Sequence, residues 1–433
     1  MKNEVFAASI AFVAAVSFAA LPHVDQNAVV LAQDSYSRLV TVTYTLTGEP
    51  AVITIDFQTN EVANAESGWL SIGAVNFTNT IGAVNQVVST GEHDIYWQPK
   101  LSWPNIEVGA GKFRAVVTAW ATNAPPDYCA VCLLEGAQEF ARRRYFANAE
   151  AVPGGVQNRM YKTDYLLLRK VPAAGVVWRM GMANCPQNRQ DLGYCHKIML
   201  RKDYYIGVYE ITQCQWWRVY GGGMSTTFHD INNENAEIFP QPWAQWSQIR
   251  GTYDSYPWPA EAGHERDVDP NSYLGKLRVR TGIGSFDLPT EAQWEYACRA
   301  GTGTLFANGG DTQNDFNLMG WDNVNWNDGA VPDDLRVHAV GLKRPNNWGL
   351  YDMHGNVMEL VLDWYADIDV ATSDTVSVDP IGPSTGDNKV WRGGHTWSNW
   401  EVCSSSNRSQ KNTPADSNLV LGFRPVCDAA AVE

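Results

Sequence analysis

Two carboxylates lie close together in the C-terminal third of the chain, Asp352 and Glu359, on either side of the dipeptide Gly355-Asn356. Glycine beside a small polar residue favours a tight turn, which brings flanking side chains together and turns backbone carbonyls inward. Adjacent carboxylates repel each other unless a cation lies between them. Calcium, which takes roughly six to eight oxygen ligands, is one such cation. A buried arginine, Arg392 or Arg424, is the alternative.

The surrounding sequence is rich in glycine and tryptophan, which predicts a core built between loops rather than along long helices. Four motifs resemble those of the formylglycine-generating enzyme (sulfatase-modifying factor) family, a variant of the C-type lectin fold, and they occur in the family's order. They are Leu288–Tyr296, Asn346–Glu359, Trp391–His395 and Leu421–Arg424. The resemblance covers roughly residues 164–426, and we therefore expect a domain of this α+β type at 161–428.

The resemblance implies a calcium site at the positions of Asp352, Gly355, Val357 and Glu359. A second family calcium site falls on a gapped stretch and implies a weaker set of ligands, Asn323, Val324, Asp333 and Leu335. Met358 and Leu360 stand where the family usually has tryptophans, which alters the packing beside the first site.

Active members of the family oxidise a cysteine of a target peptide with oxygen and copper(I), which two cysteines hold. The corresponding positions here are Ser398 and Cys403. A protonated serine is a hard ligand and does not replace a thiolate, which is the ligand that copper(I) prefers. The family's serine after the Gly-Gly pair is His395 here. Trp397 and Trp400, in the same polar loop, are predicted to line a binding groove together with His395.

Cys403 has a second assignment, because the loop from Gly394 to Arg408 is shorter than in active members. Moving the gap places Cys403 on the family's structural cysteine, whose partner position is Cys298, and that alignment leaves no copper cysteine. We expect a Cys298–Cys403 disulfide on this basis, a local Cys185–Cys195 bridge across a polar loop, and, as a weaker guess, Cys214–Cys427. Cys129 and Cys132 follow a Pro-Pro turn, which favours a structural bridge or a free pair over a redox motif.

The whole chain has 433 residues, which predicts two domains, and its net charge of −15 argues against nucleic acid and anionic membrane surfaces as partners. Lys2 and the apolar run from Val5 to Leu21 are typical of a secretory signal peptide within residues 1–32, with cleavage after Ala20 or Ala32. We do not expect a membrane span in the mature chain. These features predict a secreted or cell-envelope protein. Such a compartment is oxidising, so the cysteines can form disulfides there.

Residues 36–122 alternate between apolar and polar side chains, as in Val40–Leu46, Val52–Phe57 and Phe113–Trp120, and this pattern predicts an all-β sandwich. Residues 123–160 are predicted to be a linker. The next domain should begin with strands at 175–181 and 203–210. Capping boxes at Thr212/Gln215 and Thr290/Gln293, and a helix between Asp269 and Gly282, predict three short helices.

Three functions follow from these observations. The first is a non-catalytic protein that binds a peptide, protein or glycan through the former peptide groove. The second is a divergent copper oxidase that converts a sulfatase cysteine to formylglycine, with His395 in place of the missing thiol. The third is a structural cell-surface component assembled through the β domain.

Overall fold

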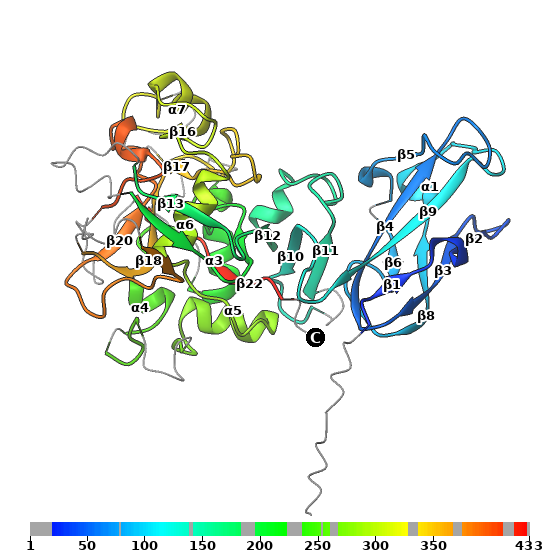
Figure 1. Ribbon diagram of the computed structural model, residues 1–433, viewed down its shortest axis with the longest axis horizontal. Coiled ribbons are helices and arrows are strands. Elements are labelled where there is room, and N and C mark those ends of the chain that lie inside the picture. Colours follow the sequence, from blue (N-terminus) through cyan, green and yellow to red (C-terminus); the bar gives the residue numbers. More distant parts are fainter. Residues whose placement is uncertain are drawn as a thin grey trace, which may run out of the picture.

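The computed structural model describes residues 20–430 except 78, 138–141, 183–194, 223–235, 253, 260–266, 328–336, 367–374 and 410–419. Figure 1 shows two units side by side, a smaller one made of strands from the N-terminal part of the chain and a larger one that holds the remaining strands and most of the helices.

The smaller unit is a sandwich of two antiparallel sheets, as its period-two pattern predicts. In one sheet β3 (Val40–Thr47) pairs with β8 (Gly91–Trp97), and in the other β4 (Ala51–Thr59) pairs with β9 (Phe113–Ala121). Both sheets contribute to one apolar core, in which Phe57 stacks on Trp97 with ring centroids 4.4 Å apart. The other elements are β1 (His23–Val24), η1 (Gln26–Ala28), β2 (Val30–Gln33), β5 (Leu70–Ser71), η2 (Ala74–Phe77), β6 (Ile81–Gly82), β7 (Val87–Val88) and α1 (Pro99–Ser102).

The sandwich begins earlier than the sequence predicted. β1 and β2 both pair with β3, and Val24 is buried in the core. Of the two predicted cleavage positions, the one after Ala32 would remove β1 and most of β2 from the sheet, whereas the one after Ala20 would leave both strands in place. The signal peptide itself stays a prediction.

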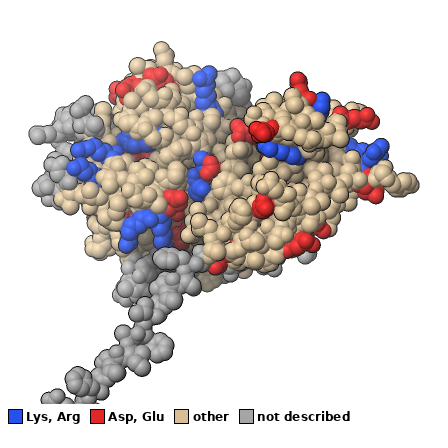
Figure 2. Space-filling view, turned by 45° about the vertical axis from the view of Figure 1, so that its right-hand side comes forward, with Lys and Arg blue, Asp and Glu red and all other residues tan. Residues whose placement is uncertain are grey.

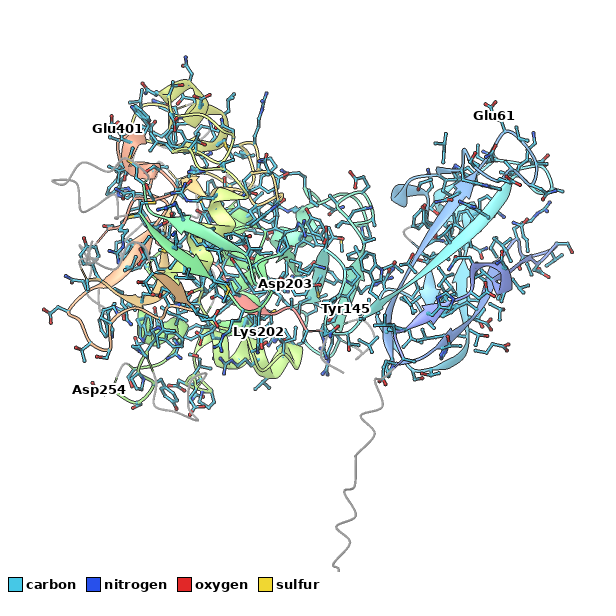
Figure 3. All side chains as sticks on the ribbon, in the orientation of Figure 1. Glu61, Tyr145, Lys202, Asp203, Asp254 and Glu401 are labelled. Carbon is cyan, nitrogen blue, oxygen red and sulfur yellow. The ribbon has the colours of Figure 1, made fainter. Side chains whose placement is uncertain are left out.

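The predicted linker at 123–160 contains two strands of the larger unit, so that boundary is also wrong. β10 (Tyr128–Cys132) and β11 (Arg143–Phe146) extend a five-stranded sheet of order β11-β10-β12-β15-β22. β11 also joins the two units, since the backbone N–H of Tyr145 donates to the carbonyl of Asn85 at 2.9 Å and Arg144 donates to the carbonyl of Thr80. Figure 3 places Tyr145 at this junction.

The larger unit has an α+β architecture with many short strands. β12 (Tyr165–Val171) and β15 (Tyr204–Gly207) are central in the five-stranded sheet, and β22 (Val426–Asp428) brings the C-terminal segment to its edge. A three-stranded sheet combines β20 (Lys389–Arg392), β18 (Met358–Trp364) and β21 (Leu421–Gly422). The remaining strands are β13 (Val177–Met180), β14 (His196–Met199), β19 (Val376–Val378), β16 (Gly320–Trp321) and β17 (His354–Gly355).

The three predicted helices are present. α3 (Gln213–Tyr220) and α6 (Glu291–Arg299) both begin with the expected capping boxes, at Thr212 and Thr290. α5 (Tyr273–Thr281) ends at Gly282 as expected, but its N-cap is Ser272 rather than Asp269, because the Ser272 hydroxyl accepts from the N–H of Gly275.

Shorter helical elements were not predicted, namely η3 (Arg159–Lys162), η6 (Ala236–Ile238), α4 (Trp246–Ile249), α7 (Gln313–Met319) and η8 (Trp400–Cys403). Across the described parts of the chain, the helices are too short or too polar to traverse a lipid bilayer.

Candidate functional site

The segment from Asp352 to Glu359 contains β17 and enters β18, and it has the tight geometry expected from its sequence. Asp352 and Asn356 both adopt positive φ angles, 57° and 61°. A Cβ atom on Gly355 would lie 2.1 Å from the carbonyl oxygen of Trp321, so only glycine fits at this crossing. The turn is thus fixed by close backbone packing against β16.

Glu359 forms a buried ion pair with Arg424, which is the arginine alternative weighed from the sequence. The Nη2 atom of Arg424 donates to Oε1 of Glu359 at 2.6 Å, and its Nε donates to Oε2 at 2.7 Å. The indole N–H of Trp294, in α6, also donates to Oε2. Both oxygens of Glu359 are therefore occupied, and Arg424 uses its remaining N–H groups on the carbonyls of Gly207, Val208 and Tyr351.

Asp352 and Glu210 are the other buried carboxylates around Arg424. Oδ2 of Asp352 accepts from the N–H of Gly341 at 2.6 Å, whereas Oδ1 is buried with no hydrogen-bond partner. Glu210 accepts from the Asn356 amide at 2.8 Å and from the N–H of Val357. Burial raises the pKa of Asp352 to about 6, and burial together with Asp352 raises the pKa of Glu210 well above its ordinary value.

Glu210 was missed in the sequence analysis. The sequence feature that could have identified it is its position as the single acidic residue in the apolar stretch from Ile206 to Ile211. A buried charge in such a run needs a partner, which indicates a paired carboxylate.

The calcium positions fit a cation only in part. Asp352 supplies an unpartnered buried oxygen, but Glu359 is held by Arg424, and within the described ranges there is no group of three or more His, Cys, Asp or Glu side chains arranged to bind a metal. Of the weaker set, Asp333 and Leu335 lie outside the described residues. Asn323 donates its N–H to the carbonyl of Ser398, and Val324 is exposed.

The loop after the Gly-Gly pair, residues 393–408, is held by a second buried arginine. Arg392, in β20, donates to the backbone carbonyls of Ser405, Ser406 and Asn407 at 2.7–3.0 Å. It also pairs with two carboxylates of α6, with Glu291 at 3.3 Å and with Glu295. Helix α6 thus positions this loop through Arg392. The sequence pattern of α6 did not predict this role.

Ser398 and His395 form a compact turn in this loop. The N–H of Ser398 donates to the carbonyl of His395 at 2.8 Å, and the N–H of His395 points back to the Ser398 hydroxyl at 3.3 Å. Nδ1 of His395 accepts from the N–H of Trp397, whose side chain is 45% exposed. Trp400 is half-buried against Phe306. The loop therefore presents His395 and Trp397 near the surface, while Trp400 anchors it.

Cys403 lies beneath the loop and has no exposed surface. It belongs to an apolar cluster with Phe306 and Phe316, and a Cβ atom on Gly394 would lie 2.5 Å from its sulfur. Burial raises the pKa of the Cys403 thiol far above its ordinary value, so the sulfur is a neutral thiol at physiological pH. Figure 3 shows Glu401, in the same short helix η8, at the end of the larger unit that is remote from the sandwich.

The predicted Cys298–Cys403 disulfide is not formed in the structure, where both residues are free thiols. The Cys298 sulfur lies 3.7 Å from the carbonyl oxygen of Met353 and 3.8 Å from Nε2 of His354. The Cys403 sulfur instead faces the carbonyl of Asn399, and Nδ1 of His354 contacts the Cys403 carbonyl. Each thiol thus has its own backbone acceptor, and the imidazole of His354 contacts both residues.

The weaker guess, a Cys214–Cys427 disulfide, is also not formed, and the two residues lie buried in α3 and β22. Cys195 is a free thiol, and its predicted partner Cys185 lies outside the described residues. Cys129 and Cys132 are a free pair in β10, one of the two outcomes that the sequence favoured.

Comparison with known proteins identifies the family. Residues 171–429 match the family model of the sulfatase-modifying factor enzyme 1-like domain. The chain belongs to this family. It is similar to the formylglycine-generating enzyme of Streptomyces coelicolor, with 37% identity over 229 residues, 48% of this chain and 69% of that protein. The bovine formylglycine-generating enzyme is 29% identical over 322 residues, 66% of this chain and 81% of that protein. Among solved structures, Treponema denticola variable protein 1 aligns with a TM-score of 0.47 and 24% identity over 61% of this chain and 95% of that one.

The sequence analysis expected copper ligands at Ser398 and Cys403, but these two residues do not offer the donor set that copper(I) needs. One is the hydroxyl of Ser398, which hydrogen bonds within its own turn, and the other is the buried neutral thiol of Cys403. Cys403 is also the only cysteine between Gly394 and Arg424. A linear pair of thiolates is therefore lacking at these positions.

Proposed function

We propose that this member of the family is a secreted or cell-envelope protein that binds a peptide, protein or glycan without converting it. One observation carries the proposal: at the two positions that the family resemblance assigns to copper, Ser398 supplies a hydroxyl and Cys403 a buried thiol of raised pKa. Without two thiolates, copper(I) loses both affinity and geometry, and oxygen activation fails at its first step.

The loop at 393–408 keeps what a binding surface needs. Arg392 and α6 fix its backbone, and Trp397 offers an exposed aromatic ring beside His395, with ring centroids 6.4 Å apart. Aromatic side chains supply large contact area at low cost in conformational entropy, and rigid loops bind with less loss of freedom. The proposal assigns this surface to the partner.

Mass spectrometry decides between binding and turnover. The full chain is incubated with copper(I), oxygen and a peptide that carries the sulfatase-type Cys-x-Pro-x-Arg motif, and the aldehyde product is sought. We expect no conversion. Copper-dependent conversion that is lost in Cys403→Ala would establish the alternative, a copper oxidase that makes formylglycine. Conversion that appears only in Ser398→Cys would assign the loss of activity to that ligand.

Calcium at Asp352, Gly355, Val357 and Glu359 stays a prediction. The unpartnered Oδ1 of Asp352 supports it, and the engagement of Glu359 with Arg424 favours the ion pair instead. If calcium binds the folded state, chelator lowers the melting temperature and added calcium restores it. An unchanged melt after chelation, in protein shown to be free of metal, would leave the ion pair as the complete explanation of the turn.

A further inference from the structure

A cavity of about 780 Å³ lies between the C-terminal end of α3, one face of α5 and the segment that follows β10. None of the described residues that line it belongs to the loop at 393–408. In Figure 1, α5 runs along the lower edge of the larger unit, whereas η8 lies at its upper end. The cavity is therefore separate from the surface to which the proposed function assigns a partner. Its volume lies within the range of roughly 300–1,000 Å³ that small-molecule sites occupy.

The lining of this cavity is basic in a protein that is acidic as a whole. Among the described residues that line it, four are basic and one, Glu135, is acidic. The basic residues are Arg142, Arg218, Lys276 and Arg280. Figure 2 shows charges of both signs scattered in small groups over the face in view, so four cations around one cavity is a local concentration.

Neutral carbonyls hold two of these cations, so their charge is not cancelled. Lys276 donates to the carbonyl of Tyr220 at 2.8 Å, and Arg280 donates to the carbonyls of Leu133 and Arg218. The contacts with Tyr220 and Arg218 cap the last turn of α3, which is a sufficient structural role for Lys276 and Arg280. Arg218 pairs with Asp164 at 2.8 Å, although its Nε is buried without a partner.

Arg142 and Trp217 take no part in that capping. Arg142 donates through Nε to the carbonyl of Ala137, and no contact to an acidic side chain is recorded for it among the described residues. Trp217 is 41% exposed, and the guanidinium of Arg218 lies 5.1 Å from the centroid of its ring. An exposed indole beside a cation offers a flat apolar platform next to a charge, which helix capping does not explain.

We propose that this cavity binds an acidic oligosaccharide. The apolar face of one sugar ring packs on Trp217, and the carboxylate or sulfate groups accept hydrogen bonds from Arg142 and Arg218. The guanidinium fork can bind two oxygens of a carboxylate or of a sulfate group, and the volume accommodates several sugar rings rather than a single ion. The site goes beyond the proposed function, because it is a second binding site on another part of the domain.

The test is calorimetric titration of the full chain with hexagalacturonate, a hexasaccharide that carries one carboxylate on each sugar. Its methyl ester, which has the same rings without the charges, is the matched ligand control. We expect the acid to bind, the ester to bind at least tenfold more weakly, and the affinity for the acid to fall several-fold between 50 and 500 mM salt, because screening weakens exposed charges. Failure of the acid to bind at millimolar concentration, or equal binding of the ester, would overturn the proposal.

Variants locate the site. Arg142→Gln and Trp217→Ala should each weaken binding about tenfold without lowering the melting temperature. Arg201→Gln, an exposed arginine paired with Asp379 outside this cavity, should bind as the wild type does. Unchanged affinity in both cavity variants overturns the assignment. Loss of binding in Trp397→Ala alone would also overturn it, by placing the sugar on the loop of the proposed function. A linear hexaphosphate that binds as tightly as the sugar acid and competes with it would exclude a saccharide-specific site.

Discussion

The two units of this protein are stabilised in different ways. Among the described residues of the sandwich, the buried polar side chains are two threonines, Thr54 and Thr80, and no charged side chain is buried. The larger unit buries arginines, lysines and carboxylates throughout, including Arg392 and Arg424 at 1% and 0% exposure. A sheet satisfies its own backbone by pairing strands, whereas loops leave carbonyls that need donors from elsewhere. The guanidinium groups of the larger unit supply those donors.

This difference predicts that losing one buried arginine damages the larger unit more than losing a methylene damages the sandwich. Arg392→Met removes three hydrogen bonds to the carbonyls of residues 405–407 and one partner each of Glu291 and Glu295. We expect a loss of about 3–5 kcal/mol in the free energy of unfolding of the larger unit. Hydrogen exchange resolved by peptide, read separately in α6 and in β4, measures it. A loss below about 1 kcal/mol, or an equal loss of protection in β4, would contradict the comparison.

The larger unit should also carry a pH dependence through Asp363. Burial, followed by the nearby Glu291, raises the pKa of Asp363 to about 7, and its Oδ2 accepts from the N–H of Glu291 at 2.7 Å. The unfolded chain ionises this group near 4, so the folded state binds the additional proton between about pH 4 and 7 and loses stability as the pH rises through that window.

Asp363→Asn cannot ionise and keeps an oxygen for the same N–H. The wild type should therefore lose about 2 kcal/mol of its free energy of unfolding, relative to the variant, when the pH rises from 5 to 7. Chemical denaturation at both pH values measures the change. The same gap between the two proteins at both pH values would show that Asp363 does not titrate in this window.

The sandwich should respond to small changes of volume and remain insensitive to pH. Ile53 in β4 is fully buried in its apolar core, so Ile53→Val removes one methylene group and should cost about 1 kcal/mol. The loss should be the same at pH 5 and pH 7 when hydrogen exchange is followed in β4. A loss that varies with pH would mean that the sandwich and the larger unit unfold together. Because β11 joins the two units, this measurement tests directly whether their unfolding is coupled.

The difference between the two units also explains which parts of the fold could be predicted from the sequence. The strands of the sandwich follow a period of two, and β3, β4 and β9 lie within two residues of their predicted bounds. The capping boxes located α3 and α6, because both halves of that motif are local. Contacts between distant residues leave no such pattern. The pairing of β10 with β12, and of Arg392 with the carboxylates of α6, therefore had to be seen in three dimensions.

The candidate site shows the same limit. Its glycine motifs predicted a tight turn and named Arg424 as one possible partner of Glu359, and both are present. The sequence did not predict that Cys298 and Cys403 would each face a different backbone carbonyl, those of Met353 and Asn399. Spacing between cysteines constrains a disulfide only weakly when the geometry of the side chains is unknown.

An exposed ion pair provides the smallest expected effect and tests whether burial, rather than charge pairing itself, is what matters. Arg159 and Glu237 are joined by a contact of 2.9 Å, the same length as two contacts of Arg424, but both side chains are 45% exposed. Water and salt screen such a pair, and ordering two long side chains offsets most of the attraction. We expect Arg159→Gln to change the free energy of unfolding by less than about 0.5 kcal/mol at 150 mM salt, measured by denaturation beside Arg392→Met. If Arg159→Gln costs as much as the buried variant, the number of ion pairs and not their burial would set the stability of the larger unit, and the contrast with the sandwich would need another explanation.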